Sequence, residues 1–388
     1  MISAPGPNAL GYNGLTERRD GLPAHTYYDP GHFALELQRI WHRNWLYAGR
    51  SAELARPGDY RTFEFGDQRA LLVRDADGEL RGFHDTCRHR GAALCREARG
   101  RFGAAGIVCP YHAWVYSLRG DLLRTSSKSH GSGFDPADHS LYPVRVMEWN
   151  GFMFAAFAAD APPLQANFDQ PLDRMDAWPL RDLVVGHVFT KTMFCNWKVF
   201  WENYNECLHC PGVHPRLSQL VPIFGRALLE QKDDPDWSRQ PDEDPKYRGG
   251  LRQGAATWSM DGAATGSVFP RVSEEDRRIG HVYMTSLPSV FIVGHVDYVR
   301  VVRLRPLAPE MTEINVEYLF APQTLADPHV DLHNIVEFTN LVMTEDAQIC
   351  ELNQRGLHAA PHAHGVLMPE EYMIAQFHDW VLAELSRC

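Results

Sequence analysis

Two closely spaced Cys/His pairs constrain this chain more than any other feature of its sequence. Cys87-x-His89 is followed, after a spacer of 19 residues, by Cys109-x-x-His112. Two thiolates and two imidazoles on two short turns indicate a metal centre with sulfur and nitrogen ligands. A [2Fe–2S] cluster with cysteines on one iron and histidines on the other has such ligands, and so has a structural zinc ion. Zinc fingers usually pair Cys with Cys and His with His along the chain, so this arrangement favours the cluster.

The residues around these pairs resemble a known family. The motifs CRHRGAAL and CPYHAWVYSLRG resemble the Rieske segment in the α subunits of Rieske non-haem iron oxygenases, the ring-hydroxylating oxygenase family. The resemblance implies that Cys87 and Cys109 bind one iron of a [2Fe–2S] cluster. It implies equally that His89 and His112 bind the other iron.

Length, charge and cysteine usage indicate a soluble enzyme. The 388 residues suffice for two domains with their own cores. A formal net charge of −11 without a basic run argues against a nucleic-acid partner. No apolar stretch reaches the ~20 residues of a membrane span, and no secretory signal is visible. The eight scattered cysteines suggest reduced thiols and metal ligands without a disulfide framework, which favours a cytoplasmic location.

Turn spacing and apolar periodicity predict three segments. Residues 1–37 form an N-terminal segment expected to pack on the catalytic domain, residues 38–150 an all-β Rieske domain, and residues 151–388 the catalytic domain. Strands are predicted over residues 59–65, 70–74, 80–84, 151–157, 184–194, 281–294, 297–305 and 313–321. Helices are predicted after Asp29, near Asn196, and over residues 330–355 and 369–385.

The run of strands between helices predicts an α+β catalytic domain on an antiparallel sheet, which the resemblance makes a helix-grip (SRPBCC/START-like) domain. The alternation of residues 299–305 suits a strand with one wetter face. The acidic, Pro-containing segment 230–250 predicts a mobile loop or lid, although a solvated insertion without a role explains it equally well.

A second candidate metal site lies in WENYNECLHCPGVHP, residues 201–215. Glu206 and His209 are three apart and share a face if they lie on a helix. Together with His214 and a distant carboxylate, His209 supplies the facial triad of non-haem Fe(II) oxygenases. A single histidine among 19 is more simply an ordinary residue, but this pair lies beside Glu206 and downstream of the Cys/His loops.

The third ligand of the mononuclear iron comes from the resemblance. The family closes its triad with an Asp followed by four residues and a Glu. Asp346 matches that aspartate, because Glu351 follows it at the same spacing. Glu345 remains the alternative, since the sequence does not show which of the two adjacent carboxylates points inward.

Glu206 stands where the family usually has an Asp that bridges two metal centres. That carboxylate joins an iron-bound histidine to a Rieske histidine of the neighbouring subunit. Transferred to this chain, it would accept N–H bonds from His209 and from His112 of the next chain, which fixes both rings and couples the centres. The resemblance therefore implies a head-to-tail homotrimer.

Glu206 with the following Cys-x-His-Cys is similar to the branch of the family that oxidises quaternary ammonium compounds such as glycine betaine, stachydrine and carnitine. Such a cation has no hydrogen to donate, so aromatic faces and carboxylates must hold it. For most of the aromatic candidates a place in the core is the simpler explanation. The candidates are Trp201, Tyr204, Trp258, Tyr283, Phe291 and Tyr298.

The resemblance implies a terminal oxygenase that receives NAD(P)H electrons through a separate flavin/iron–sulfur reductase or ferredoxin, since the chain has no dinucleotide motif of its own. We expect O2-dependent hydroxylation of an N-methyl carbon, followed by loss of formaldehyde. The alternative substrate is an aromatic acid, oxidised by mono- or dioxygenation. A Rieske-type electron carrier and a zinc-stabilised binding protein are the non-oxygenase alternatives. The presence of a β-type subunit is left open.

Overall fold

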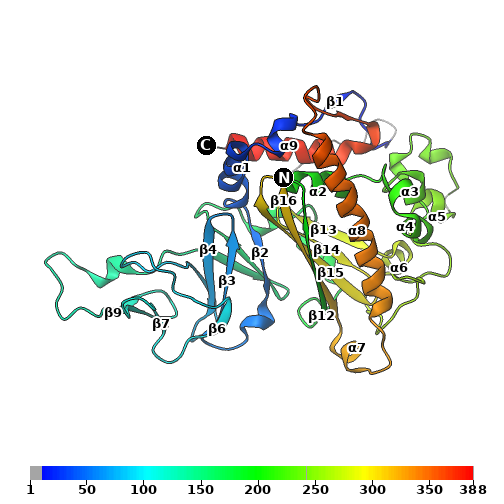
Figure 1. The fold of residues 1–388 in the computed structure, drawn as a ribbon. Helices are drawn as coiled ribbons and strands as arrows, with labels where there is room; N and C mark the ends of the chain where they lie inside the picture. The colour runs from blue at the N-terminus through cyan, green and yellow to red at the C-terminus, as the bar shows by residue number, and fades with distance from the viewer. Residues whose placement is uncertain (1–10, 242, 388) are drawn as a thin grey trace. The chain divides into compact units, whose positions relative to one another are not determined.

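The computed structural model describes residues 11–241 and 243–387 (Figure 1). They divide into two units, one of residues 41–164 and one of residues 11–40 with 165–241 and 243–387. Residues 1–10 of the predicted N-terminal segment lie outside the described residues. The division follows β11 (Phe152–Ala156), whereas the sequence placed the domain boundary at 150, because β11 pairs with β2 (Leu46–Arg50) at the start of the same unit.

The 41–164 unit consists of three small antiparallel sheets, which confirms the predicted all-β domain. The first has the order β10-β11-β2, with β10 at Arg145–Trp149. The second has the order β5-β4-β3-β6, with β3 at Asp59–Phe65, β4 at Gln68–Arg74, β5 at Leu80–His84 and β6 at Arg99–Arg101. The third has the order β7-β8-β9, with β7 at Ile107–Val108, β8 at Val115–Tyr116 and β9 at Leu122–Arg124.

The larger unit is built on a five-stranded antiparallel sheet, as predicted for an α+β domain. Its order is β12-β16-β15-β14-β13. The strands are β12 (Val184–Met193), β13 (Val282–Ser286), β14 (Val290–Gly294), β15 (Tyr298–Ala308) and β16 (Met311–Phe320). The single strand predicted over 281–294 is wrong: the chain turns at residues 287–289, so β13 and β14 form a hairpin with Ser286 opposite Val290.

Helices surround this sheet, and the longest crosses one of its faces (Figure 1). That helix, α8, is fixed to the sheet where the buried Tyr318 hydroxyl meets Thr339 Oγ1 at 2.6 Å and Asn340 Oδ1 at 2.8 Å. The helices are α1 (Pro30–Glu36), α2 (Trp197–Tyr204), α3 (Cys210–Val213), α4 (Pro215–Leu220), α5 (Pro245–Arg248), α6 (Glu274–Ile279), α7 (Pro322–Ala326), α8 (His333–Gly356) and α9 (Tyr372–Ser386). A short strand pair joins β1 (Arg19–Asp20) to β17 (Val366–Leu367).

Local capping explains where two of the predicted helices begin. The Asp29 side chain accepts a hydrogen bond from His32 N at 2.7 Å, with Pro30 as the first helical residue of α1. The Asn196 side chain accepts from Lys198 N at 3.0 Å and starts α2. In the described part of the chain, no helix has the length and hydropathy that crossing a membrane requires.

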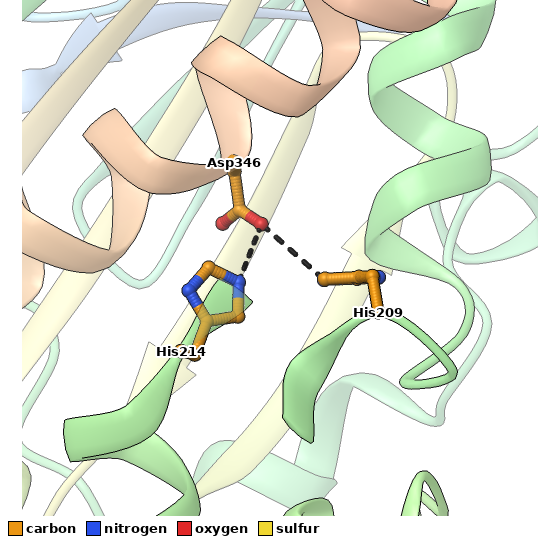
Figure 2. Close-up of side chains that lie close together, drawn as sticks. All are labelled: His209, His214 and Asp346. Carbon is orange, nitrogen blue, oxygen red and sulfur yellow. Dashed lines mark hydrogen bonds and ion pairs between the residues drawn. The ribbon is translucent and has the colours of Figure 1, made fainter. Parts of the chain in front are cut away.

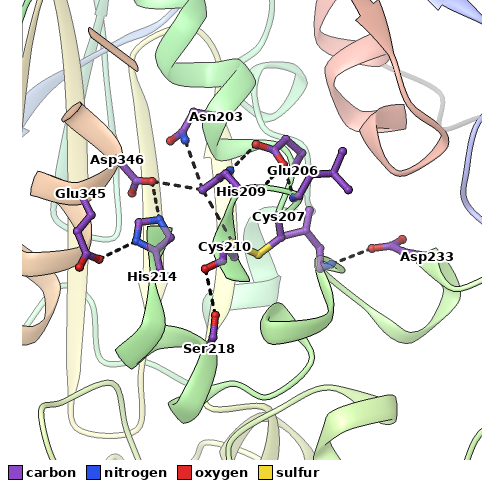
Figure 3. Close-up of a disulfide and its surroundings, with 12 residues drawn as sticks. Asn203, Glu206, Cys207, His209, Cys210, His214, Ser218, Asp233, Glu345 and Asp346 are labelled. Atoms are coloured by element: carbon purple, nitrogen blue, oxygen red, sulfur yellow. Dashed lines mark hydrogen bonds and ion pairs between the residues drawn. A yellow bond between two sulfur atoms is a disulfide. The ribbon is translucent and has the colours of Figure 1, made fainter. Parts of the chain in front are cut away.

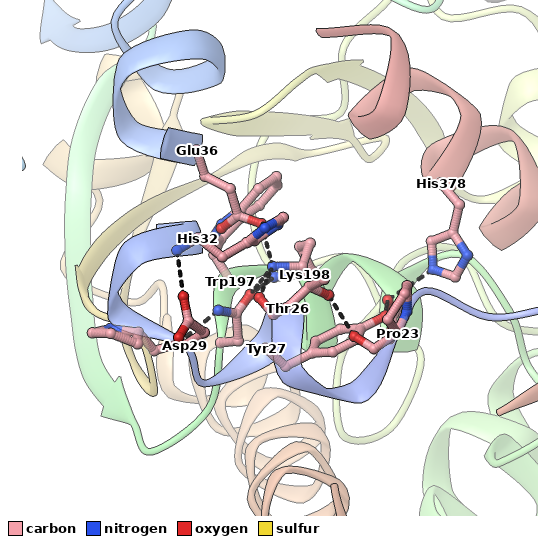
Figure 4. Close-up of polar contacts among 12 residues, drawn as sticks. Pro23, Thr26, Tyr27, Asp29, His32, Glu36, Trp197, Lys198 and His378 are labelled. Atoms are coloured by element: carbon pink, nitrogen blue, oxygen red, sulfur yellow. Dashed lines mark hydrogen bonds and ion pairs between the residues drawn. The ribbon is translucent and has the colours of Figure 1, made fainter. Parts of the chain in front are cut away.

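A buried ion pair ties the N-terminal residues to α2 (Figure 4). Lys198 and Glu36 are both completely buried, and Lys198 Nζ lies 2.5 Å from Glu36 Oε1. The second carboxylate oxygen accepts from Trp197 Nε1 at 2.8 Å, and Lys198 also donates to Thr26 O at 3.0 Å. Burial alone raises the pKa of Glu36, but Lys198 and the other donors outweigh burial and lower it. The pair is therefore charged and fully hydrogen-bonded.

Candidate metal sites and substrate cavity

Three predicted ligands converge in the larger unit, where Figure 2 shows His209, His214 and Asp346 facing one another. One ligand atom of each lies within 4.8 Å of the other two, the only such group of three or more in the described chain. Asp346 Oδ1 is 2.8 Å from His214 Nε2 and 3.4 Å from His209 Nε2. The histidines flank α3, whereas the aspartate comes from α8, so the fold brings together residues 132 positions apart.

Two further carboxylates hold the outer nitrogens of these imidazoles (Figure 3). Glu206 Oε1 is paired with His209 Nδ1, and Glu345 Oε2 lies 2.8 Å from His214 Nδ1. Each carboxylate therefore leaves Nε2 directed at Asp346. Glu345, the alternative third ligand, points at the outer nitrogen of His214 and does not join the group. The sequence gave no indication that Glu345 would contact this nitrogen.

The local structure around Glu206 differs from the prediction. Helix α2 ends at Tyr204, so Glu206 and His209 lie in a turn before α3 and not on a helix. The turn keeps the two side chains in contact because the Glu206 carboxylate also accepts from the backbone N of Leu208. The expectation of reduced thiols is wrong at Cys207 and Cys210, which form a disulfide across this turn (Figure 3).

The electrostatics of the three-residue group suit a bound cation. Burial opposes a charge on His209, but the carboxylates of Asp346 and Glu206 outweigh burial and raise the pKa of this imidazole to about 9. Burial alone raises the pKa of Asp346, and the two imidazoles outweigh it and lower the pKa. A bound divalent cation would take the place of the protons that these carboxylates attract. Two imidazole nitrogens with one carboxylate are the donor set of a facial Fe(II) site.

The predicted cluster ligands sit on two neighbouring loops of the 41–164 unit. Cys87 and Cys109 are buried free cysteines, with exposures of 3% and 2%. The rings of His89 and His112 are 4.8 Å apart between centroids, and Trp114 stacks on His89. Among the described residues, no three ligand atoms of these four side chains lie close enough together to bind a single ion. A tetrahedral zinc needs that convergence, whereas a two-iron cluster divides its ligands between two metals.

A cavity of about 990 Å³ opens at the mononuclear group. Four of the six aromatic candidates line it together with His209, His214 and Asp346: Tyr204, Trp258, Tyr283 and Phe291. Trp201 and Tyr298 are not among the lining residues and are completely buried. Their polar atoms bond to the backbone, at Pro288 O (2.9 Å) and at Trp258 O (3.0 Å) respectively.

The cavity wall near Phe291 is densely aromatic. The ring centroid of Tyr204 lies 4.3 Å from that of Phe291 and 5.7 Å from that of Tyr283. Segment 230–250, which the sequence leaves open as either a lid or an insertion without a role, contributes residues 230–232 and 248–250 to the cavity lining. Gating by this segment stays a prediction.

Arg300 and His281 also line the cavity, and neither was predicted as a site residue from the sequence. Strand β15 carries three arginines, which suggested one wetter face. Arg303 and Arg305 do lie together and pair with Glu313 at 3.8 and 3.0 Å. Arg300 has the opposite parity and is only 3% exposed. The sequence did carry one sign of this inward position: Arg300 is two residues from Tyr298, so the two side chains lie on the same face of the strand.

His281 is expected to make the protein less stable in acid. Burial, assisted by the nearby Arg300, lowers the pKa of His281 from 6.5 to about 4. The unfolded chain therefore binds a proton at this site between pH 6.5 and 4, whereas the folded chain does not. Stability is complete above that window and falls by up to about 3 kcal/mol as the pH drops through it.

The measurement is the free energy of urea unfolding of the wild type and of His281→Gln at several pH values from 7.5 to 4. As the pH falls, we expect the free energy of unfolding of the wild type to decrease relative to that of His281→Gln, because glutamine does not titrate. A constant difference across this range would contradict the assignment.

The comparisons with known proteins agree with this architecture. Residues 44–135 match the family described as Rieske [2Fe-2S] domain, and residues 180–387 match the ring hydroxylating alpha subunit (catalytic domain). The chain therefore belongs to the ring-hydroxylating α-subunit family of Rieske non-haem iron oxygenases, enzymes that combine a Rieske cluster with a mononuclear iron. The predictions of family, fold class and cofactors are confirmed. The electron-carrier and zinc-protein alternatives are wrong, because the chain matches both domains of the oxygenase family.

Individual relatives cover nearly the whole chain. A glycine betaine monooxygenase oxygenase subunit from Chromohalobacter salexigens is 30% identical over 383 residues, covering 92% of this chain and 84% of the relative. A chloroplastic choline monooxygenase from Beta vulgaris is 27% identical, with 92% and 76% covered. A crystal structure of CntA, described as a quaternary ammonium Rieske monooxygenase, has the same fold, with a TM-score of 0.72 at 22% identity over 94% of this chain and 95% of that one.

Proposed function

We propose that this protein is the terminal oxygenase component that removes an N-methyl group from a quaternary ammonium compound. The observation that carries the proposal is the cavity beside His209, His214 and Asp346, whose walls are aromatic. Support comes from the 30% identity to a glycine betaine monooxygenase oxygenase subunit and from the choline monooxygenase relative.

The sequence motifs and the geometry of the larger unit support one set of residues for each metal centre. We propose that Cys87, His89, Cys109 and His112 bind the [2Fe–2S] cluster, and that His209, His214 and Asp346 bind the mononuclear iron. When bound, these centres supply the one-electron and O2 chemistry of the reaction. Glu206 and Glu345 hold the outer nitrogens of the iron-binding imidazoles and so fix their tautomers and orientations.

The aromatic wall supplies binding for a cation that cannot donate a hydrogen bond. The faces of Tyr204, Tyr283 and Phe291 meet at one side of the cavity, where their ring quadrupoles attract a trimethylammonium group. Such contacts contribute about 0.5–2 kcal/mol each. The same apolar faces exclude water from the N-methyl carbon that reacts.

The net reaction balances with two electrons from an external reductase. One oxygen atom of O2 becomes the hydroxyl of an N-hydroxymethyl group, and the other leaves as water after taking up two protons. The C–N bond to that carbon then breaks, the nitrogen keeps the electron pair, and the hydroxyl proton departs. The products are formaldehyde and a tertiary amine.

Electron delivery depends on a partner. Within one chain, the Glu206 carboxylate contacts His209. We propose that the same carboxylate accepts a second N–H from His112 of a neighbouring chain in a homotrimer, and that a separate reductase reduces the cluster. The cytoplasmic location remains a prediction from the sequence.

A single-turnover experiment tests the substrate without an identified reductase. The iron-loaded protein is reduced with dithionite, desalted under argon and mixed with O2 and one candidate substrate. We expect formaldehyde and the demethylated amine in equal amounts from at least one quaternary ammonium compound of a panel of glycine betaine, carnitine and choline. The controls are protein without substrate and His214→Ala protein with substrate.

The aromatic alternative gives a different result in the same experiment. If benzoate yields a hydroxylated product while no quaternary ammonium compound yields formaldehyde, the proposed function is wrong. Formaldehyde without the matching amine would show a side reaction and would contradict N-demethylation.

A further inference from the structure

The Arg300 side chain is a buried cation at the cavity wall. It is only 3% exposed and lies on β15, directly opposite Tyr318 of β16 and Val293 of β14. Together with Tyr283 of β13, these residues form one row across the sheet face that bears α8. A guanidinium in such a place loses most of its hydration, which is unfavourable unless an anion compensates the charge.

No carboxylate of the described residues compensates this charge. The guanidinium of Arg300 has no hydrogen bond or ion pair to another described side chain, and its Nε is buried without a partner. Arg303 and Arg305 of the same strand share Glu313 as their partner. Arg300 is thus the exception among the arginines of β15, and the exception faces the cavity.

The acidic residues that line the cavity are all engaged elsewhere. Glu206 and Asp346 bond to histidines, Asp169 accepts from Thr285 N, Glu230 from Asn13, and Glu275 pairs with Arg278. The charge of Arg300 is therefore available to a molecule that enters the cavity.

The neighbours of Arg300 add further unpartnered nitrogens and no carboxylate. Its guanidinium lies over the ring of Trp258, 5.6 Å from the centroid, and the Trp258 Nε1 is buried without a partner. His281, whose ring centroid is 5.2 Å from that of Trp258, has a buried, unpartnered Nδ1. Three unpartnered nitrogens thus line the cavity, and two of them, Arg300 Nε and Trp258 Nε1, are N–H donors. Buried donors normally have an acceptor.

The position of Arg300 relative to the iron-binding group gives the site a polarity. Burial raises the pKa of Tyr283 to about 12, while Arg300 lowers it and Asp346 raises it. Tyr283 therefore lies within electrostatic reach of both groups. A trimethylammonium group is repelled by Arg300 and attracted by aromatic faces and by the carboxylates of the iron-binding group.

We propose that Arg300 binds a carboxylate of the substrate, so that the substrate is a zwitterion whose quaternary ammonium end points toward His209, His214 and Asp346. This inference rests on the proposed function for the cation, but the anion site stands on Arg300 alone. It separates this chain from an enzyme for a quaternary ammonium alcohol, which offers no anion to the guanidinium.

Three ligands of similar size test the two ends separately. Glycine betaine has both charges, 3,3-dimethylbutanoate has the same shape and the carboxylate but no cation, and choline has the cation but no carboxylate. Their dissociation constants are measured by isothermal titration calorimetry on the iron-loaded, reduced protein under argon. The variants are Arg300→Gln and, as a matched control, Arg305→Gln, which removes the same charge from the opposite face of the same strand.

We expect Arg300→Gln to weaken glycine betaine and 3,3-dimethylbutanoate by about 10- to 100-fold, the range for a charged hydrogen bond lost from a buried site. Choline should bind the variant as well as or better than the wild type, because repulsion by the guanidinium is removed. Arg305→Gln should bind all three ligands like the wild type. Because Arg300→Gln removes an uncompensated buried charge, its Tm should not fall, and Arg300→Lys should retain part of the carboxylate affinity.

The results also separate this inference from the proposed function. Unchanged carboxylate binding in Arg300→Gln, or an equal loss for choline, would overturn the anion site while leaving N-demethylation intact. Binding of 3,3-dimethylbutanoate that depends on Arg300, with no binding of either quaternary ammonium compound, would support the anion site and refute the proposed function.

Discussion

Replacing His214 with alanine is expected to remove the mononuclear iron, leave the Rieske cluster in place and abolish product formation. His214 is 1% exposed, and its Nε2 is one of the three ligand atoms that converge at Asp346. Loss of an outer hydrogen-bond partner typically costs roughly 10- to 100-fold in metal affinity, so loss of a direct ligand costs more. The cluster ligands lie in the other unit and should not respond.

The measurement combines iron analysis with spectroscopy of the reduced protein. We expect the variant to contain only the two irons of the cluster and to retain the Rieske EPR signal, while the single-turnover yield of formaldehyde drops to background. Glu345→Gln is the graded comparison, because it keeps Nε2 of His214 in place and changes only the partner of Nδ1. His333→Ala, an exposed histidine of α8, is the neutral control. A His214→Ala protein with its full iron content would disprove the assignment.

Replacing Lys198 with methionine is expected to destabilise the larger unit by about 3–5 kcal/mol, because it leaves Glu36 buried without its cation. Both partners are completely buried, and the pair joins the N-terminal residues to α2. The fall in free energy of unfolding is measured by urea denaturation, with the Rieske EPR signal as a check that the other unit is intact.

Two matched variants show whether the buried charge causes the loss. Lys198→Met combined with Glu36→Gln removes both charges and should recover much of the stability. Arg19→Met breaks an exposed pair with Asp379 (2.6 Å) between the N-terminal residues and α9 and should cost at most about 1 kcal/mol. Equal losses for Lys198→Met and Arg19→Met would show that burial of the pair has no special effect.

Features that depend on neighbouring residues could be predicted from the sequence. The Cys87–His89 and Cys109–His112 pairs indicated a cluster because their spacing alone places one thiol and one imidazole on each turn. The strands at 59–65 and 80–84 followed from alternation between turn residues, and α2 from the capping residue Asn196. These signals are local, and they survive folding unchanged because each is satisfied within a few residues.

Features that depend on the direction of a side chain needed the tertiary structure. Asp346 and Glu345 are adjacent, and only the rotation of α8 against the turn at His214 sends one toward Nε2 and the other toward Nδ1. Trp201 and Tyr204 share α2, but only Tyr204 reaches the cavity. The scattered cysteines of the sequence favoured free thiols, whereas the structure has a disulfide between Cys207 and Cys210.

The chain by itself determined the chemistry: which residues can bind metals, at which spacings, and hence the family. The tertiary structure decided which charged side chain faces the cavity. Parity along β15 places Arg300 inward and Arg303 and Arg305 outward, while the pairing of β13, β14 and β15 aligns Arg300 with Tyr283. Whether a charged side chain such as Arg300 has a partner depends on the residues that the neighbouring strands and α8 place around it. Those residues are distant in sequence and share a cavity only after the sheet has formed.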